Sequence, residues 1–543
     1  MQTFNADEIG WKAQSKSGAV AAGGAASVAA GMHILAQGGN AADAAAATIF
    51  ALNVTDHGAC SIGGEVPLLI YDAKRREVKS LSGQGRAPLS REAIDWYMEN
   101  GIPGAGDIKI APVPSVVDLC ITTLIQYGTM GFAEIIAPTL DLLDKGAEDW
   151  EPRLAVTLRK MVEEEELTNG SREEKLQAAC DRFYGRHPVR NDIAEDLEAF
   201  YIENGGFLRR VDLAAHHTRI EDPVKVDYHG YRICKCDTWT QGPYLCQTLR
   251  LLEDFDLKAM GHLSADYIHV AIEAIKLAMA NRDAYYGDPE FVDVPLQLLL
   301  SDEYTRIRTP LIDMHNASNE ARPGDPIHMR PLKGSGVFRP GVGGTTTCVV
   351  ADRWGNVVAA TPSANVHGQN PPGGRAGVTF GNRLRSLNTT PGHPNCIEPG
   401  KRPRITLTPT LVLKNQKPIL AISVAGGDLQ DQATLNLLLD FIEFGQMPEQ
   451  AVTQPRFATS HHQDSFDPNP RRNETFIKAG SLTINDTLAN TVQAELSSRG
   501  HDLEVKQGAI ANPVMLYIDP VDGTFYAAGD PAARRHAAGL EGD

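Results

Sequence analysis

Residues 344–361 read GTTTCVVADRWGNVVAAT, and this stretch decides which fold the chain can adopt. Threonine and valine are β-branched and favour strands, so the runs on either side of DRWGN predict a β-hairpin. With Trp354 at the centre of the turn, Thr345 faces Ser363. Side chains alternate along a strand, so Asn365 points to the same face as Ser363. A β-bulge would shift this register by one residue.

A threonine that begins a chain can act as a nucleophile. Cleavage between Gly344 and Thr345 would give Thr345 a free α-amine, whose usual pKa of about 7.7–8.0 leaves part of it unprotonated at neutral pH. That amine can take the proton of the hydroxyl on the same residue, directly or through water. We expect Ser363 to orient the hydroxyl and Asn365 to stabilise the site by hydrogen bonding. An ordinary strand that begins with three threonines is the alternative interpretation.

A second hairpin is predicted further along the chain. Residues 406–413 and 418–424 have the composition of strands, and residues 414–417 form the turn between them. The second strand runs into Gly426-Gly427. Adjacent glycines let the backbone approach a ligand closely and expose N–H groups, which are the donors of an oxyanion hole. By itself the pair is also typical of an ordinary turn, so its meaning depends on Thr345.

A linker rich in proline and glycine, residues 322–344, divides the chain. Before the linker we expect mainly helices, with a few short strands. The clearest of these elements are helices at 25–35, 40–52 and 264–284 and strands at 66–71, 77–81 and 224–236. After the linker the chain is rich in strands, with helices only near 431–444 and 486–499. Cleavage before Thr345 would give a large subunit, 1–344, and a small subunit, 345–543, that together form one folded unit.

The composition is that of an ordinary globular protein. Of 543 residues, 42% are hydrophobic, and no apolar run approaches the roughly 20 residues of a membrane span. The 51 Lys and Arg against 68 Asp and Glu give a charge of −17, which argues against nucleic acid or an anionic membrane as the main partner. The N-terminal stretch lacks the apolar segment of a secretory signal, and the eight cysteines form no CxxC pair. We therefore expect a cytoplasmic protein with reduced thiols and no cofactor. Cys234 and Cys236 alternate with other residues as on a strand, so the sequence favours a strand over a metal site here.

Short motifs along nearly the whole chain resemble the gamma-glutamyltransferase family of N-terminal-nucleophile hydrolases. Each motif is short, but their order and spacing are specific. The motifs are Gly38-Gly39-Asn40-Ala41-Ala42-Asp43-Ala44, Arg86-Ala87-Pro88, Thr240-Gln241-Gly242, Asn281-Arg282-Asp283, Thr345-Thr346, Asp352-x-x-Gly355-Asn356, Lys401-Arg402-Pro403, Thr408-Pro409-Thr410 and Gly426-Gly427. The resemblance implies an α+β fold, the four-layer αββα sandwich. It also implies a precursor that cleaves itself into two subunits, which form a heterodimer or a dimer of such heterodimers.

The resemblance gives a role to each of the residues singled out at the ends of the two hairpins. Thr345 matches the family's nucleophile, and Ser363 matches a position, commonly threonine, that hydrogen-bonds the nucleophile. Asn365 matches an asparagine of the site. Gly426 and Gly427 match the oxyanion-hole pair.

The positions that would hold a gamma-glutamyl group depart from the family pattern. Gln84 stands where an arginine usually binds the substrate α-carboxylate, and Arg86 follows two residues later. Ser386 stands near the place of the acid that usually binds the α-amine. The family's Ser-Ser pair reads Ile405-Thr406. The sequence therefore looks closer to the divergent acylase-like branch, which includes cephalosporin acylases and oxamate amidohydrolase.

Arg86, Arg383 and Arg404 flank these motif positions and are suited to bidentate binding of a carboxylate, with Thr406 as a further substrate contact. We expect a self-processing amidohydrolase that cleaves a small carboxylate-bearing amide through a threonyl acyl-enzyme. One alternative is a gamma-glutamyl hydrolase or transferase acting on glutathione-like compounds. Another is a non-catalytic scaffold or binding protein in which Thr345 stays internal. The chain has neither the strand–GxGxxG–helix context of a nucleotide site nor the GxSxG elbow of a serine hydrolase.

Overall fold

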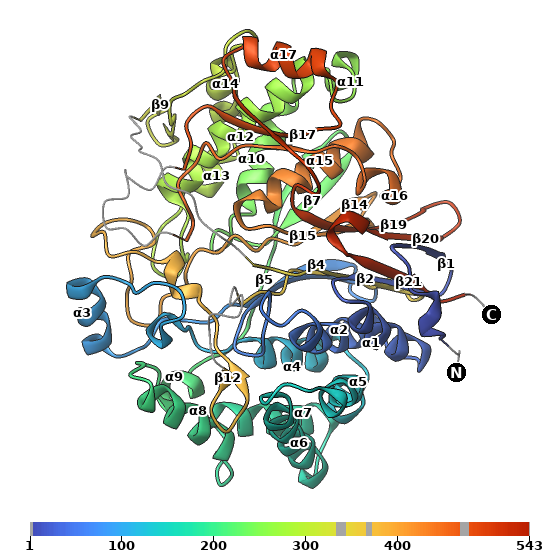
Figure 1. Cartoon of the computed structure of the whole chain (residues 1–543), viewed down its shortest axis with the longest axis vertical. Helices are drawn as coiled ribbons and strands as arrows, with labels where there is room; N and C mark the ends of the chain where they lie inside the picture. Colours follow the sequence, from blue (N-terminus) through green and yellow to red (C-terminus); the bar gives the residue numbers. More distant parts are fainter. Residues whose placement is uncertain (1–3, 333–343, 365–371, 467–476, 542–543) are drawn as a thin grey trace.

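Two seven-stranded β-sheets lie face to face, and helices cover the outer face of each (Figure 1). The computed structural model describes residues 4–332, 344–364, 372–466 and 477–541. Its layers follow the order helix, sheet, sheet, helix, so the predicted αββα sandwich is confirmed. Among the described residues no helix is both long and apolar enough to cross a membrane.

The first sheet combines strands from both sides of the linker. Its order is β21-β2-β10-β11-β3-β4-β5, and all neighbours are antiparallel. The bounds are β2 (Gly18–Ala22), β3 (Val66–Asp72), β4 (Glu77–Gly83), β5 (Arg219–Glu221), β10 (Cys348–Asp352), β11 (Val357–Ala360) and β21 (His536–Gly539). The hairpin β10–β11 lies in the middle of the sheet, between β2 and β3.

The second sheet has the order β1-β20-β19-β15-β14-β7-β6 and is also antiparallel. Its strands are β1 (Lys12–Ser15), β6 (Val224–Tyr228), β7 (Tyr231–Lys235), β14 (Thr410–Lys414), β15 (Lys417–Ala425), β19 (Asn512–Ile518) and β20 (Phe525–Gly529). The second predicted hairpin is thus β14–β15, but the expected strand start at 406 was wrong. Ile405 instead pairs with Thr240 as an isolated bridge, so regular pairing begins at Thr410.

Helices of the first half cover the first sheet, at the bottom of Figure 1. They are α1 (Ala25–Ala36), α2 (Ala41–Thr55), α4 (Val116–Tyr127), α5 (Phe132–Lys145), α6 (Glu151–Leu167), α7 (Arg172–Tyr184), α8 (Asp192–Glu203) and α9 (Arg210–Ala214), with α3 (Arg91–Asn100) at one side. The second sheet is covered mainly by α10 (Pro243–Leu252), α12 (Ala265–Tyr285) and α15 (Gln430–Ile442). Shorter helices are α11 (Leu257–Met260), α13 (Leu296–Leu299), α14 (Asp302–Arg308), α16 (Pro448–Ala451) and α17 (Asn490–Ser498). Small groups of strands lie outside the two large sheets. Two of them are pairs, β8 (Gly324–Asp325) with β9 (Arg330–Pro331) and β12 (Pro372–Gly373) with β13 (Val378–Thr379). In the third, β17 (Ser481–Asn485) lies between β16 (Phe457–Ala458) and β18 (Asp502–Lys506).

Apolar side chains fill all three spaces between the layers. Along β10, Val350 packs towards the helices of the first sheet, whereas Val349 packs between the two sheets. On β14, Leu411 faces the same space between the sheets and Val412 faces the helices of the second sheet. Both faces of these strands are buried, which is why their sequences are continuous apolar runs rather than alternating ones.

The hairpin turn is docked on a helix end. The side chain of Asn40 accepts hydrogen bonds from the amides of Ala42 and Asp43, so Asn40 is the N-cap of α2, as predicted. The carboxylate of Asp352 accepts from the amide of Ala41 and the side-chain amide of Asn356, both at 2.8 Å. Two motifs that carry the family resemblance therefore hold the central hairpin against α2.

The hairpin register is symmetric about Trp354, as predicted. Cys348 pairs with Ala360 and Ala351 pairs with Val357. No shift interrupts this ladder, so the residues that precede β10 and follow β11 meet at the same end of the hairpin.

Candidate active site

Thr345 and Ser363 lie opposite each other just beyond the ends of β10 and β11. The Oγ1 of Thr345 lies 3.4 Å from the Oγ of Ser363, and both side chains are buried. Main-chain hydrogen bonds fix the two segments, because Thr346 donates to the carbonyl of Pro362 and Ser363 exchanges two bonds with Glu65. The contact predicted from the hairpin is confirmed.

The hydroxyl of Ser363 also reaches the peptide bond before Thr345. It donates to the carbonyl oxygen of Gly344 at 2.6 Å. A hydrogen-bond donor on a carbonyl oxygen stabilises the negative charge that develops there during nucleophilic attack. Ser363 therefore contacts both the predicted nucleophile and the carbonyl of the predicted cleavage site.

A buried ion pair holds the hydroxyl of Ser363 in place. Arg383 donates to the Oγ of Ser363 at 2.8 Å and to a carboxylate oxygen of Glu65 at 2.6 Å. The side chains of Arg383 and Glu65 are 1% and 0% exposed. Burial raises the pKa of Glu65, and the charge of Arg383 opposes that rise. The guanidinium of Arg383, a predicted substrate contact, thus already has two partners.

The glycine pair follows β15 directly. Gly427 has φ of 61°, in the left-handed region that glycine adopts without penalty. Among the described residues neither Gly426 nor Gly427 donates its N–H to a hydrogen bond. These two N–H groups are therefore available to a ligand oxygen.

Gln430, which the sequence did not single out, contacts the predicted nucleophile. It is fully buried at the start of α15, and its Nε2 lies 3.5 Å from the Oγ1 of Thr345. The sequence offered one signal for this contact. Gln430 lies three residues after Gly427, and the first turn of a helix that follows a glycine pair faces the same site as the pair.

A cavity of about 500 Å³ lies next to Thr345. It is lined by Gly24, Thr55, Asp56, His57, Ala59, Gly344, Thr345, Gly426, Asn512, Ala533, Arg534, Arg535 and His536. Asp56 accepts a hydrogen bond from the hydroxyl of Thr346 at 2.5 Å and from the amide of Gly24 at 3.0 Å. The cavity has the size of a small-molecule site and brings the predicted cleavage site and Gly426 together.

The other predicted substrate contacts have different surroundings. Arg86 is half-buried and lies 3.4 Å from Glu290. Arg404 is buried and donates to the hydroxyl of Ser465 at 2.9 Å. The hydroxyl of Thr406 is buried and has no hydrogen-bond partner among the described residues. Within the described part of the chain, the residues that line the cavity do not include Arg86, Arg404 or Thr406. Asn365 lies outside the described residues.

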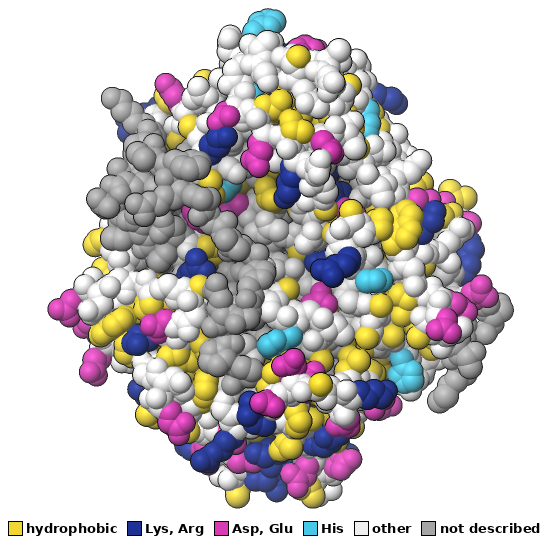
Figure 2. Space-filling model, in the orientation of Figure 1, with side chains coloured by type: hydrophobic (Ala, Val, Ile, Leu, Met, Phe, Trp, Pro, Cys, Tyr) yellow, Lys and Arg dark blue, Asp and Glu magenta, His cyan; other side chains and the backbone are white. Residues whose placement is uncertain are grey.

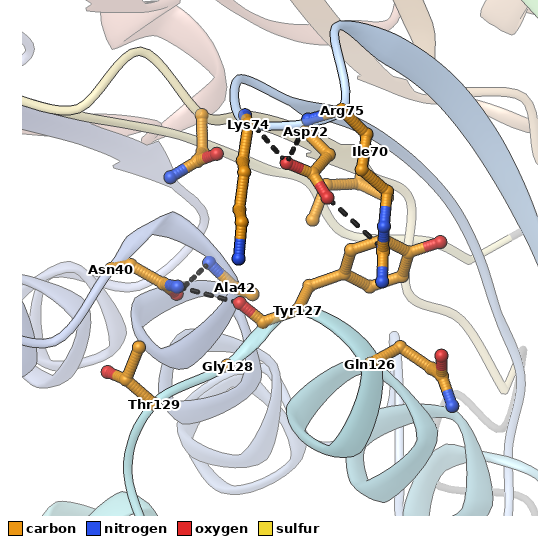
Figure 3. A pocket seen from close by; sticks show the side chains of 11 residues that line it. Asn40, Ala42, Ile70, Asp72, Lys74, Arg75, Gln126, Tyr127, Gly128 and Thr129 are labelled. Carbon is orange, nitrogen blue, oxygen red and sulfur yellow. Dashed lines mark hydrogen bonds and ion pairs between the residues drawn. The ribbon is translucent and has the colours of Figure 1, made fainter.

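A second cavity, of about 350 Å³, lies between the β3–β4 turn, the start of α2 and the end of α4 (Figure 3). Asp72 accepts from the amide of Lys74 and pairs with Arg75, and Asn40 donates to the carbonyl of Tyr127. These polar groups already stabilise a turn and a helix cap. Figure 2 shows basic and acidic side chains interspersed over the visible face of the molecule, without a large area of one sign.

Comparison with solved structures defines the class of protein. The cephalosporin acylase of Bacillus halodurans superposes with a TM-score of 0.79 over 100% of this chain and 98% of that chain, at 24% identity. The chain therefore has the fold of the N-terminal-nucleophile hydrolases.

Sequence comparison then gives the family. The gamma-glutamyltranspeptidase family model matches residues 27–175 and 150–540. The glutathione hydrolase proenzyme of Bacillus subtilis (strain 168) is 29% identical over 94% of this chain and 89% of that protein. The acylase ACY 1 proenzyme of Pseudomonas sp. (strain SE83) is 27% identical over 92% and 89%. The chain belongs to the gamma-glutamyltranspeptidase family of enzymes, whose relatives here include both glutathione hydrolases and acylases.

Proposed function

We propose that the chain is a self-processing amidohydrolase that cleaves a small carboxylate-bearing amide through a threonyl acyl-enzyme. The observation that carries this proposal is the position of the Ser363 hydroxyl between the Oγ1 of Thr345 and the carbonyl oxygen of Gly344. One hydroxyl can thereby hydrogen-bond both the peptide carbonyl at the cleaved bond and the nucleophile that attacks it. The names of the relatives as proenzymes support a precursor.

In the first reaction the Oγ1 of Thr345 attacks the carbonyl carbon of Gly344. Negative charge develops on the carbonyl oxygen, where the Ser363 hydroxyl donates its hydrogen bond. As the C–N bond breaks, the hydroxyl proton passes to the leaving nitrogen, and an ester remains between Gly344 and Thr345. Water hydrolyses this ester, which separates subunits 1–344 and 345–543 and leaves Thr345 with a free α-amine.

In the second reaction the α-amine accepts the proton of the Thr345 hydroxyl, which attacks the substrate amide. The N–H groups of Gly426 and Gly427, which have no other acceptor among the described residues, stabilise the oxyanion. The substrate amine leaves, and water hydrolyses the acyl-enzyme. Asn365 assists by hydrogen bonding, and Arg86, Arg383, Arg404 and Thr406 remain proposed contacts of the substrate.

A second candidate is hydrolysis or transfer of a gamma-glutamyl group, which the names of the glutathione hydrolase relatives favour. Ser386 and Gln84 distinguish the two candidates, because neither can pair with the ammonium or the carboxylate of a glutamyl group as an ion. An unpaired buried ammonium costs several kcal/mol.

An activity screen of the processed protein against oxamate, glutaryl anilide, a cephalosporin side-chain amide and gamma-glutamyl anilide tests the proposal. We expect an acidic amide without an α-amine to have the highest kcat/KM. Gamma-glutamyl anilide as the best substrate would establish the second candidate. A protein that stays uncut and turns over none of them would be a binding protein.

A further inference from the structure

The turn that enters the last strand of the first sheet forms one wall of the cavity at Thr345. Arg534, Arg535 and His536 line the cavity together with Thr345 and Gly426. This turn lies close in space to the cleavage site, although about 190 residues separate them in the sequence.

The buried guanidinium of Arg535 makes no hydrogen bond within the described part of the chain. Its side chain is 10% exposed, and its Nε makes no hydrogen bond with any described residue. The nearest carboxylate is that of Asp56, at 3.9 Å from Nη1, which is too long for a hydrogen bond. A guanidinium carries five N–H donors, and burying them unmet is costly. Arg535 therefore lines the cavity with donors that no described residue uses.

Asp56 lies too far from Arg535 to supply the missing partner, and three other groups hold its carboxylate in this position. One oxygen accepts from Gly24 and Thr55, and the other accepts from Thr346. The side chain of Arg534, at the exposed rim, makes no ion pair within the described part of the chain. His536 donates its Nδ1 hydrogen to the carbonyl of Gly23 at 2.7 Å. Two guanidinium groups against one carboxylate leave this wall of the cavity positively charged.

The three arginines expected from the sequence to bind a carboxylate are placed differently. Arg383 bonds Glu65 and Ser363, Arg404 bonds Ser465, and Arg86 pairs with Glu290. Arg535 combines burial, unused donors and a position on the cavity that Thr345 lines.

We propose that Arg535, with Arg534 at the rim, binds an anionic group of the substrate beside Thr345, most simply a carboxylate held by the planar guanidinium fork. The inference rests on the proposed function, since it names the substrate class of the same site: a small amide with a negative charge. The cavity volume of about 500 Å³ suits such a molecule.

The test compares two substrates that differ in one charge, glutaryl anilide and pentanoyl anilide. We expect Arg535→Gln to lower the ratio of their kcat/KM values at least about tenfold, with the anionic substrate losing far more. Arg535→Lys, which keeps the charge but not the fork, should retain part of the ratio. The control Arg91→Gln removes an exposed charge on α3 and should leave the ratio as in the wild type.

A binding measurement separates this inference from the proposed chemistry. Titration of the uncut Thr345→Ala chain with glutarate, followed by calorimetry, needs neither cleavage nor turnover. We expect the added substitution Arg535→Gln to weaken glutarate binding at least about tenfold, and Arg534→Gln to weaken it less. These uncut variants also give a result if Arg535→Gln prevents self-cleavage of the chain that keeps Thr345.

An unchanged substrate ratio together with unchanged glutarate affinity would overturn the inference. The same holds if Arg86→Gln, and not Arg535→Gln, abolishes the preference for the anionic substrate. Failure of the proposed function looks different, because the wild-type chain would then be uncut and inactive on both anilides whatever stands at position 535.

Discussion

The hydroxyl of Ser363 donates a hydrogen bond of 2.6 Å to the carbonyl oxygen of Gly344, the residue immediately before Thr345. In the proposed mechanism this bond activates the peptide bond that must break. It also explains why a hydroxyl residue stands at this place in the hairpin, since an apolar side chain would leave the carbonyl without its donor.

Ser363→Ala should slow self-cleavage by about 10²–10³, the usual cost of losing one oxyanion donor. A time course of purified precursor on denaturing gels measures the rate. Ser363→Thr keeps the hydroxyl and serves as the matched control. Cleavage of the alanine variant at the wild-type rate would show that the contact with Gly344 has no part in the reaction.

Arg383→Met should destabilise the chain by about 3–5 kcal/mol, because it leaves the carboxylate of Glu65 buried without its cation. The double variant Arg383→Met with Glu65→Gln should recover part of the loss, since the unpaired charge is then gone. Urea unfolding in the uncut Thr345→Ala background measures both. Equal destabilisation in the single and double variants would mean that the charge of Glu65 is unimportant.

Gly427→Ala should reduce kcat by up to about 10²–10³ with little change in KM, because the added Cβ strains the left-handed backbone and would displace an oxyanion donor. Gly445→Ala is the matched control. Its φ of 67° is close to the 61° of Gly427, but open space surrounds it. If both variants lose activity equally, general strain is responsible and the oxyanion assignment is unsupported.

His216 makes stability depend on pH. Burial lowers its pKa to about 4 from the usual 6.5, so between these values the unfolded chain binds a proton that the folded chain does not. Stability should therefore fall as the pH drops from 6.5 towards 4. His216→Phe should flatten this dependence in urea titrations of the Thr345→Ala chain at pH 5 and pH 7, whereas replacement of the exposed His315 by Gln should not. An equally steep loss in the His216 variant would assign the effect to other groups.

The sequence predicted the part of the fold that depends on local pattern. The β-branched runs around Trp354 determined the register that places Thr345 opposite Ser363, and Asn40 was identified as a helix cap from its neighbours. In both cases residues close in the chain make the contacts, so periodicity and turn chemistry are sufficient.

The support of the site could not be predicted in the same way. Glu65 and Arg383 are separated by 318 residues, and nothing in either segment indicates the other. Arg535 reaches the cavity only because β21 pairs with β2 at the edge of the first sheet. The start of the second hairpin was misplaced because the bridge of Ile405 to Thr240 depends on another segment.

The central claim is that Thr345 is the nucleophile of self-cleavage, and N-terminal sequencing with intact mass measurement tests it most directly. We expect two fragments in the wild-type chain, the smaller beginning at Thr345, and a single uncut chain in Thr345→Ala. Cleavage of Thr345→Ala at the same bond, or a wild-type enzyme that hydrolyses amides while it remains uncut, would show that Thr345 is not the nucleophile of self-cleavage.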